Sequence, residues 1–237
     1  MRFLLLLLIL PWPAAALSPA DKLEVTGIVR EVLRTDPGLL RDALRALEVD
    51  DARQQLAATQ DALAIIGPRL IDPRDPVAGN PLGDVTIVNF YDTRCPYCRQ
   101  MLPTEAELLR QDPGVRLVHK DLPVLGQTSQ LEARALLAAQ KQGGYFKLQA
   151  SIMRTAAPST RDTLRAEADR LGLDGPRLMR DLDDPVIKER LAVTIAMADQ
   201  LGLQGTPALV VGNRLLSGAQ TIETLQAAVA QARAARK

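Results

Sequence analysis

The chain has 237 residues, a formal net charge of +1 and 47% hydrophobic residues, of which few are aromatic. Its 29 basic and 28 acidic residues are interspersed, so charge gives no reason to expect nucleic acid or an anionic membrane as a partner. The length is sufficient for one large domain, or for a core domain with a smaller addition.

The first 16 residues have the layout of a secretory signal peptide. Arg2 supplies a positive charge, residues 3–10 are an unbroken apolar run, and residues 14–16 offer an A-x-A cleavage site. The alternative is an uncleaved membrane anchor, which needs about 20 apolar residues, and this run is shorter. We therefore expect cleavage after Ala16 and a mature protein in an oxidising compartment, most simply a bacterial periplasm.

Residues 17–66 are expected to form an N-terminal helical region, in which residues 21–66 are wholly helical. Apolar residues recur there at helical spacing in three short segments, the last of which spans residues 51–66. Short helices of this kind can bury few of their apolar side chains among themselves. Residues 21–66 therefore either pack onto the main domain or pair with copies of themselves, and the pattern leaves both alternatives open.

A proline- and glycine-rich linker at residues 67–83 is the expected boundary to a domain of residues 84–237. Ser129 and Glu132 have the spacing of a capping box, which predicts the start of a helix. The order of elements indicates an α/β fold, with a mixed sheet flanked by helices. In chain order we expect a strand at 85–91, a helix at 96–109, a strand at 115–118, a helical block at 129–201, strands at 208–211 and 215–216, and a C-terminal helix capped by Thr221. Within the block we expect a first helix that ends at residues 143–144, followed by helices at 145–154, 160–171 and 185–201.

Cys95 and Cys98 are the only cysteines in the sequence. A structural zinc site needs about four ligands, and a disulfide framework uses several spaced pairs, so this C-x-x-C pair indicates redox chemistry. A strand that ends at Tyr91 and a helix that starts at Pro96 place Cys95 at a helix N-terminus, where a thiolate is favoured. Cys98, one turn further, is expected to be shielded and to resolve the mixed disulfide that Cys95 forms.

These residues also carry a family resemblance. Residues 85–101 (VTIVNFYDTRCPYCRQM) and the loop at 205–207 (GTP) resemble thioredoxin-fold proteins of the DsbA type, and residues 129–201 match the position of that family's helical insertion. Within the family, the CPYC motif, the lead-in at 79–84 and the N-terminal helical region resemble the suppressor-of-copper-sensitivity C proteins. The resemblance covers about residues 21–237, and it implies an α/β thioredoxin-like fold with a helical insertion and an N-terminal helical region.

The resemblance implies roles for single residues as well. Pro207 would be a cis-proline that faces the cysteines, and Thr206 would offer backbone hydrogen bonds to a substrate strand. Threonine at this position is shared with the isomerase and reductase branches, which argues against a pure oxidase. The family usually has a buried acid six residues before the first cysteine, where this chain has Asn89. Lys120, Asp121 or water is therefore expected to assist proton transfer.

Other residues near the pair have weaker signals. Tyr97 lies between the cysteines and is expected to shape the surface that substrates meet. Arg94 and Arg99 flank the pair and either help to hold the thiolate or are simply solvated. The single histidine, His119, is expected to be structural, although its side chain titrates near neutrality in other settings. No metal site is expected among the methionines, which fall at core-like positions.

The expected activity is that of a periplasmic thiol–disulfide oxidoreductase that forms, reduces or isomerises disulfides in secreted proteins through the Cys95–Cys98 dithiol, without a cofactor or metal. The expected partners are unfolded or misoxidised proteins and a membrane redox partner that resets the dithiol. The alternative is copper(I) binding by the two thiolates, which are soft donors. Homo-oligomers formed through residues 21–66 would favour isomerase activity, whereas a monomer would favour an oxidase or a reductase.

Overall fold

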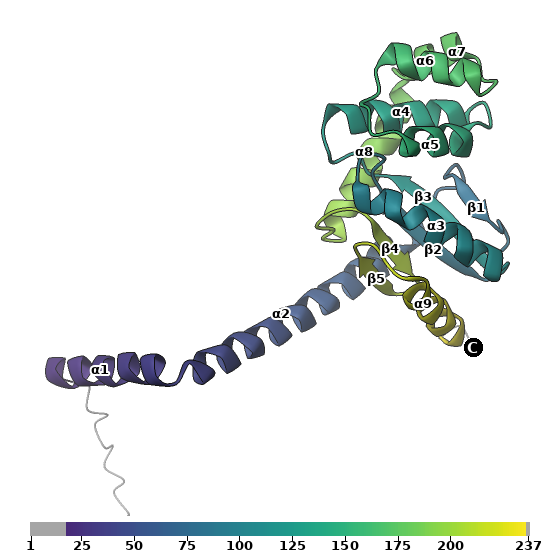
Figure 1. The fold of residues 1–237 in the computed structure, drawn as a ribbon. Helices are drawn as coiled ribbons and strands as arrows, with labels where there is room; N and C mark the ends of the chain where they lie inside the picture. The colour runs from purple at the N-terminus through teal and green to yellow at the C-terminus, as the bar shows by residue number, and fades with distance from the viewer. Residues whose placement is uncertain (1–17, 236–237) are drawn as a thin grey trace, which may run out of the picture. The chain divides into compact units, whose positions relative to one another are not determined.

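The computed structural model describes residues 18–235, and its contacts divide the chain into two compact units, residues 1–55 and 56–237 (Figure 1). The signal peptide expected at residues 1–16 lies outside the described residues. Among those residues, no helix combines the length and the apolar character that crossing a membrane requires. The unit boundary falls before Leu56 and not after residue 66, because the last turns of a long helix pack with the second unit.

The first unit consists of helix α1 (Pro19–Thr35) and most of helix α2 (Pro37–Ile66). α1 begins with a capping box in which the Ser18 side chain accepts a hydrogen bond from the Asp21 backbone and the Asp21 carboxylate accepts one from the Ser18 backbone. α2 runs unbroken through residue 51, so the separate third helix expected at 51–66 is wrong. No proline or glycine after Gly38 interrupts this stretch, and the acidic pair there is not a helix stop.

The second unit contains a five-stranded sheet with the order β1-β3-β2-β4-β5. The central strand β2 pairs parallel with β3 and antiparallel with β4, while β1 and β5 pair antiparallel at the two edges. The expected mixed sheet is therefore confirmed. The strands are β1 (Val77–Gly79), β2 (Val85–Tyr91), β3 (Val115–Asp121), β4 (Ala208–Val211) and β5 (Arg214–Ser217).

Two of these strands differ from expectation. β1 lies inside the segment expected to be a linker at 67–83, because a three-residue edge strand is too short to show a strand pattern among prolines and glycines. β3 continues three residues beyond residue 118, and these residues are polar but buried: His119, Lys120 and Asp121. The polar end of β3 therefore belongs to the interior of the second unit.

Helices cover both faces of the sheet. On one face, α3 (Pro96–Gln111) and α9 (Ile222–Ala234) pack on Ile87, Leu117 and Leu209. On the other, the end of α2 and helix α8 (Pro185–Gln200) pack on residues that include Phe90. The expected N-cap of the last helix is confirmed, since the Thr221 side chain accepts a hydrogen bond from the backbone of Thr224.

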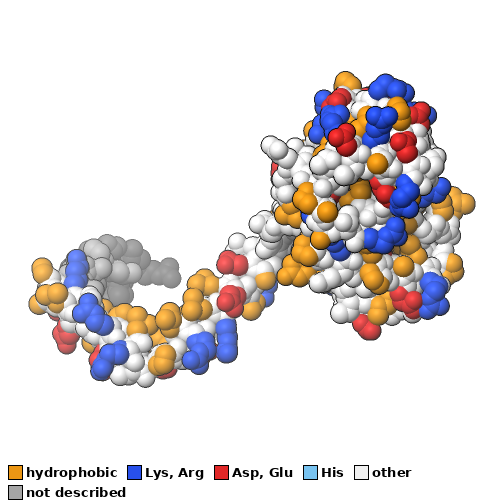
Figure 2. Space-filling model, turned by 45° about the horizontal axis from the view of Figure 1, so that its top comes forward, with side chains coloured by type: hydrophobic (Ala, Val, Ile, Leu, Met, Phe, Trp, Pro, Cys, Tyr) orange, Lys and Arg blue, Asp and Glu red, His pale blue; other side chains and the backbone are white. Residues whose placement is uncertain are grey.

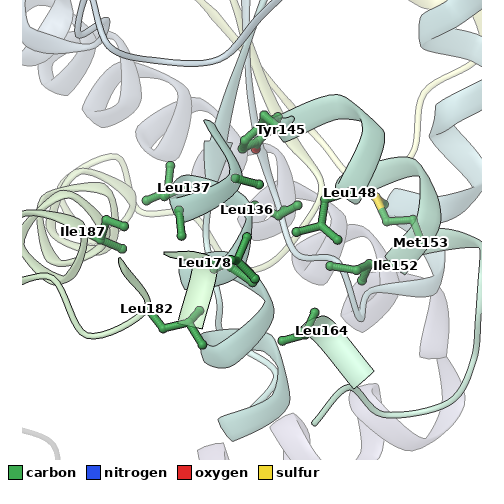
Figure 3. Close-up of a cluster of buried hydrophobic side chains, with 14 of the residues drawn as sticks. Leu136, Leu137, Tyr145, Leu148, Ile152, Met153, Leu164, Leu178, Leu182 and Ile187 are labelled. Atoms are coloured by element: carbon green, nitrogen blue, oxygen red, sulfur yellow. The ribbon is translucent and has the colours of Figure 1, made fainter. Parts of the chain in front are cut away.

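The expected helical block between β3 and β4 is present and has a core of its own, in which apolar side chains from several helices converge (Figure 3). Its first helix begins two residues before Ser129, which is buried together with Glu132, so the capping box expected there is wrong. The helices before α8 are α4 (Gln127–Gln140), α5 (Tyr145–Arg154), α6 (Arg161–Arg170) and α7 (Gly175–Asp181), of which α7 was not expected from the sequence.

Candidate active site

Cys95 occupies the N-cap position of α3, as the sequence predicts. β2 ends at Tyr91, and the Cys95 backbone N–H donates to the Asp92 carbonyl at 3.1 Å, which closes a tight turn between strand and helix. Pro96 follows at the first helical position, where it has no intrahelical N–H bond to lose. Cys98 lies one turn further on the buried side, and both cysteines are free thiols with little exposed surface.

The loop at Thr206 and Pro207 meets the cysteines from a distant part of the chain. The peptide bond between these two residues is cis, as the resemblance implies. The Cys95 thiol donates a hydrogen bond to the Thr206 carbonyl at 3.1 Å. The expected juxtaposition of this loop with the cysteine pair is therefore present.

The surroundings of Cys98 favour a neutral thiol. Burial raises the pKa of Cys98 well above its usual value, while hydrogen bonds from the Asp92 backbone and the Thr206 side chain oppose that shift. Thr206 therefore interacts with both sulfurs, through its carbonyl with Cys95 and through its side chain with Cys98. The two thiols of the pair are held in different environments, as a nucleophile and a resolving thiol require.

Polar contacts tie the loop before Cys95 to the helical block. The Thr93 hydroxyl donates to the buried carboxylate of Glu132 at 2.5 Å. Arg94 donates to two backbone carbonyls between α5 and α6, and Arg99 donates to the Thr93 carbonyl at 3.0 Å. The flanking arginines are thus neither simply solvated nor bonded to a cysteine sulfur; they fix the loop that carries Cys95.

A buried carboxyl lies next to Asn89, but it comes from α3. The Asn89 side-chain amide donates to Glu105 at 2.7 Å, and burial raises the pKa of Glu105 to about 8. The groups expected to compensate for Asn89 have other partners: Lys120 pairs with Asp75 at 2.6 Å, and Asp121 accepts from Tyr145 at 3.0 Å. Glu105 is not among the site residues that the sequence predicts, although its position seven residues after Cys98 marks the buried side of the same helix.

His119 is enclosed by aromatic rings. The rings of Tyr91 and Phe146 lie edge-on at 5.4 and 5.3 Å, and burial lowers the pKa of His119 to about 4. The imidazole is therefore neutral at ordinary pH, in agreement with the structural role expected for it. Burial also raises the pKa of Asp121, to about 7, although its hydrogen bonds with Tyr145 and Tyr91 oppose the shift.

Large apolar side chains are exposed on the cysteine loop and on the segment that follows β3. Tyr97 exposes 59% of its surface between the two thiols, and Val124 and Leu125 each expose 52% in the segment that follows β3. Within residues 18–235, no group of three or more His, Cys, Asp or Glu side chains is arranged to hold a metal ion. The copper(I) alternative therefore rests on the two thiols alone.

Comparison with known proteins gives one family. The sequence model of the DSBA-like thioredoxin domain matches residues 86–230. A thioredoxin-like oxidoreductase from Silicibacter pomeroyi DSS-3 is 40% identical, with a TM-score of 0.66, and the match covers 69% of this chain and 95% of that one. Proteus mirabilis ScsC in a transitional conformation is 26% identical, with a TM-score of 0.66 and coverages of 92% and 98%.

Curated proteins also match. The Na(+)/H(+) antiporter NhaA 3 of Salinispora tropica is 33% identical over 197 residues, which are 82% of this chain and 30% of the antiporter. The chain thus spans less than a third of the length of the curated relatives that it matches. The similarity concerns only that part of the antiporters.

Proposed function

Because this chain belongs to the DSBA-like thioredoxin domain family, we propose that it forms, reduces or isomerises disulfides in secreted proteins through the Cys95–Cys98 dithiol. One observation carries the proposal: a free thiol at a helix N-cap donates to the carbonyl that precedes cis-Pro207, with a second buried thiol one turn behind. An extended substrate segment at Thr206 would meet Cys95 directly.

The chemistry is two-step thiol–disulfide exchange. The Cys95 thiolate attacks a substrate disulfide, forms a mixed disulfide and releases the other substrate sulfur as a thiolate. Cys98 then gives up its proton and attacks the Cys95 sulfur, so that the substrate leaves reduced and the chain holds a Cys95–Cys98 disulfide. Two electrons pass from the chain to the substrate. The reverse steps pass two electrons to the chain, and return to a different substrate cysteine produces isomerisation.

Substituting each cysteine in turn tests the proposed order, in which Cys95 attacks the substrate first and Cys98 then resolves the mixed disulfide. Cys98→Ser should accumulate a mixed disulfide with a disulfide-containing peptide, because the resolving thiol is absent, whereas Cys95→Ser should form none. Non-reducing electrophoresis and mass spectrometry of the adducts would measure both. Equal adduct yields from the two variants would contradict the assignment of Cys95 as nucleophile.

The direction of electron flow follows from the reduction potential. Equilibration with glutathione, read by alkylation of the free thiols, gives this potential for the wild-type chain. A value close to ~−270 mV would identify a reductant, and one close to ~−120 mV an oxidant. We expect a value below that of a strong oxidant, because Thr206 stands where the oxidase branch more often has valine.

The proposed location is the periplasm, with cleavage of the signal peptide after Ala16. There the substrates would be unfolded or misoxidised secreted proteins, and a membrane redox partner would reset the dithiol. The N-terminal layout supports export. N-terminal sequencing of the protein recovered from a periplasmic extract tests it, and a chain that keeps residue 1 and stays in the cytoplasm would contradict it.

A homo-oligomer formed through residues 21–66 is also proposed. Large apolar side chains of residues 18–55 expose between 39% and 76% of their surface, and contiguous exposure of this kind marks interaction surfaces. Acidic and basic side chains are interspersed along the same helices, so opposite charges are available to pair between two copies. Several Cys95 sites in one assembly would favour isomerase activity.

Light scattering of the full chain tests the oligomer. A variant with Ile28→Glu and Val32→Glu places charge on the apolar side of α1 and should lower the measured mass to that of one chain. A control with Gln54→Glu and Gln55→Glu adds the same charge at exposed polar positions and should keep the mass. A wild-type chain that is already monomeric would overturn this part of the proposal.

A further inference from the structure

The carboxylate of Glu132 is buried between the helical block and the loop before Cys95. Glu132 lies on α4, and 0% of its surface is exposed. One carboxylate oxygen accepts the Ser159 hydroxyl at 2.6 Å, and the other accepts the Thr93 hydroxyl at 2.5 Å. These hydroxyl groups are neutral, and a buried carboxylate is stable only when a group of opposite charge is also near.

Arg94 supplies that opposite charge. Its Nη1 lies 3.8 Å from the Glu132 carboxylate, and the side chain of Arg94 is itself only 19% exposed. Its two Nη groups also donate to the backbone carbonyls of Ala156 at 2.7 Å and Ala157 at 3.1 Å. Arg94 directly precedes Cys95 in the chain, yet its guanidinium group is bound to the helical block. The positive charge beside the nucleophile is therefore already paired with an acid.

We propose that Glu132 is a positioning residue that lowers the reduction potential of the Cys95–Cys98 couple, because it holds and neutralises the charge of Arg94. This inference rests on the proposed function and concerns the direction in which electrons flow at that site. A cation that acts on a cysteine stabilises its thiolate, and a stabilised reduced form makes a couple a stronger oxidant. With Arg94 paired, the couple gives up electrons more readily.

Glu132→Gln tests the proposal with little change of shape. The amide oxygen can accept from one hydroxyl and the NH₂ group can donate to the other, so both hydroxyl contacts are kept while the negative charge is lost. The full-length chain is equilibrated with glutathione, in which two glutathione thiols become one glutathione disulfide as the chain's disulfide takes up two electrons and two protons. The equilibrium should shift roughly tenfold toward the reduced chain, which is ~30 mV for a two-electron couple.

Arg94→Met and the double variant separate the effect of charge from a loss of structure. Arg94→Met removes the cation and keeps the acid, so the reduction potential should not rise above that of the wild type. The double variant, with Glu132→Gln and Arg94→Met, has neither charge and should return to within about twofold of the wild-type equilibrium constant. A rise in all three variants would mean that the loop has loosened, and it would overturn the role of charge.

Glu167→Gln is the matched control within the helical block. Glu167 of α6 also accepts a serine hydroxyl, from Ser151, and it pairs with an arginine, Arg170. That arginine lies on the same helix and is not adjacent to a cysteine, so this substitution should leave the reduction potential unchanged. Asp92 and Arg99 also carry charge near the cysteines, but no variant alters them, so their contribution cancels in each comparison.

The outcomes distinguish this inference from the function on which it rests. A wild-type chain whose cysteines do not exchange with glutathione contradicts the proposed function itself. Active exchange with the same equilibrium constant in the wild type and in Glu132→Gln overturns the role of Glu132 alone. A rise in Glu132→Gln that persists in the double variant overturns it as well, because the charge of Arg94 is then not the cause. A rise in Arg94→Met by itself has the same meaning.

Discussion

Residues 18–55 and 56–235 have similar apolar patterns, but the first region leaves its apolar side chains exposed and the second buries them. Both contain leucine, isoleucine and valine at helical spacing, yet in the first region α1 buries no residue, and the apolar side chains remain visible along the helices in space-filling view (Figure 2). In the second region, leucines such as Leu136, Leu148 and Leu209 are fully buried. Helical spacing thus predicts which side of a helix is apolar, but not what covers it.

The difference lies in the number of layers that each region can assemble. The second unit encloses three apolar clusters, on the two faces of the sheet and within the helical block. Residues 18–55 form a single layer of helix, which in water is only marginally stable without a partner. We therefore expect the second unit to carry its own stability and the first to depend on contacts with other chains.

A matched pair of leucine substitutions gives the largest expected effect. Leu209→Ala removes a fully buried side chain from β4 and should lower the free energy of unfolding by about 2–5 kcal/mol, because it leaves a cavity beneath α3 and α9. Leu47→Ala removes a side chain that is 60% exposed and should change it by less than about 0.5 kcal/mol. Calorimetric unfolding of the full chain measures both changes. Equal losses of unfolding free energy would contradict the expected difference between the regions.

Local patterns predicted the elements of the second unit well. β2, β4 and α5 have the bounds that strand and helix signals indicated, because apolar runs between clear turns leave little choice. The errors occur where tertiary contacts decide. β1 is a strand only because β3 offers an edge to pair with, and α7 begins at Gly175 and Pro176, which locally look like a break.

The candidate site was predicted unevenly for a similar reason. The cysteines were evident because their spacing is itself the chemistry, and the Thr206–Pro207 loop because a family motif contains it. Asp92 and Glu105 were missed, and Glu132 was assigned to a helix cap, because an acidic residue in a sequence is expected at the surface. Their burial depends on which N–H and O–H groups the fold brings to them, and no local pattern records that.

The buried Glu105 makes the stability of the second unit depend on pH. Burial raises its pKa from 4.5 to about 8, so the folded state holds this proton more tightly than the unfolded state does. The associated stability is fully present below pH 4.5 and is lost as the pH rises through about 8. Over that window the free energy of unfolding should fall by up to ~1.4 kcal/mol per pH unit. Glu105→Gln should remove this slope above about pH 7, because Asp121, whose pKa is raised to about 7, contributes a slope of the same sign below it. Denaturant titrations between pH 5 and pH 9 would measure both parts.

Glu107→Gln is the control on the same helix. Its carboxylate pairs with Arg110 near the surface, and this hydrogen bond lowers the pKa of Glu107, so its substitution should leave the alkaline slope intact. If Glu105→Gln keeps the wild-type slope, the raised pKa does not govern the pH dependence. Asp121, whose pKa is also raised, would then be the next group to examine, through Asp121→Asn.

The smallest expected effect compares two helix N-caps, one in each unit. Ser18 caps α1 and Thr221 caps α9, each by accepting a backbone N–H three residues later, and removal of such a cap costs about 1 kcal/mol. In Thr221→Ala this cost should appear as a loss in global unfolding free energy, because α9 packs on the sheet and unfolds with it. In Ser18→Ala the same cost should appear only as faster hydrogen exchange in the first turns of α1. That helix has no buried residue, so its local opening does not change the stability of the core. A global loss of equal size in both variants would mean that the two units unfold as one, and the contrast between a self-supporting domain and a partner-dependent arm would not hold.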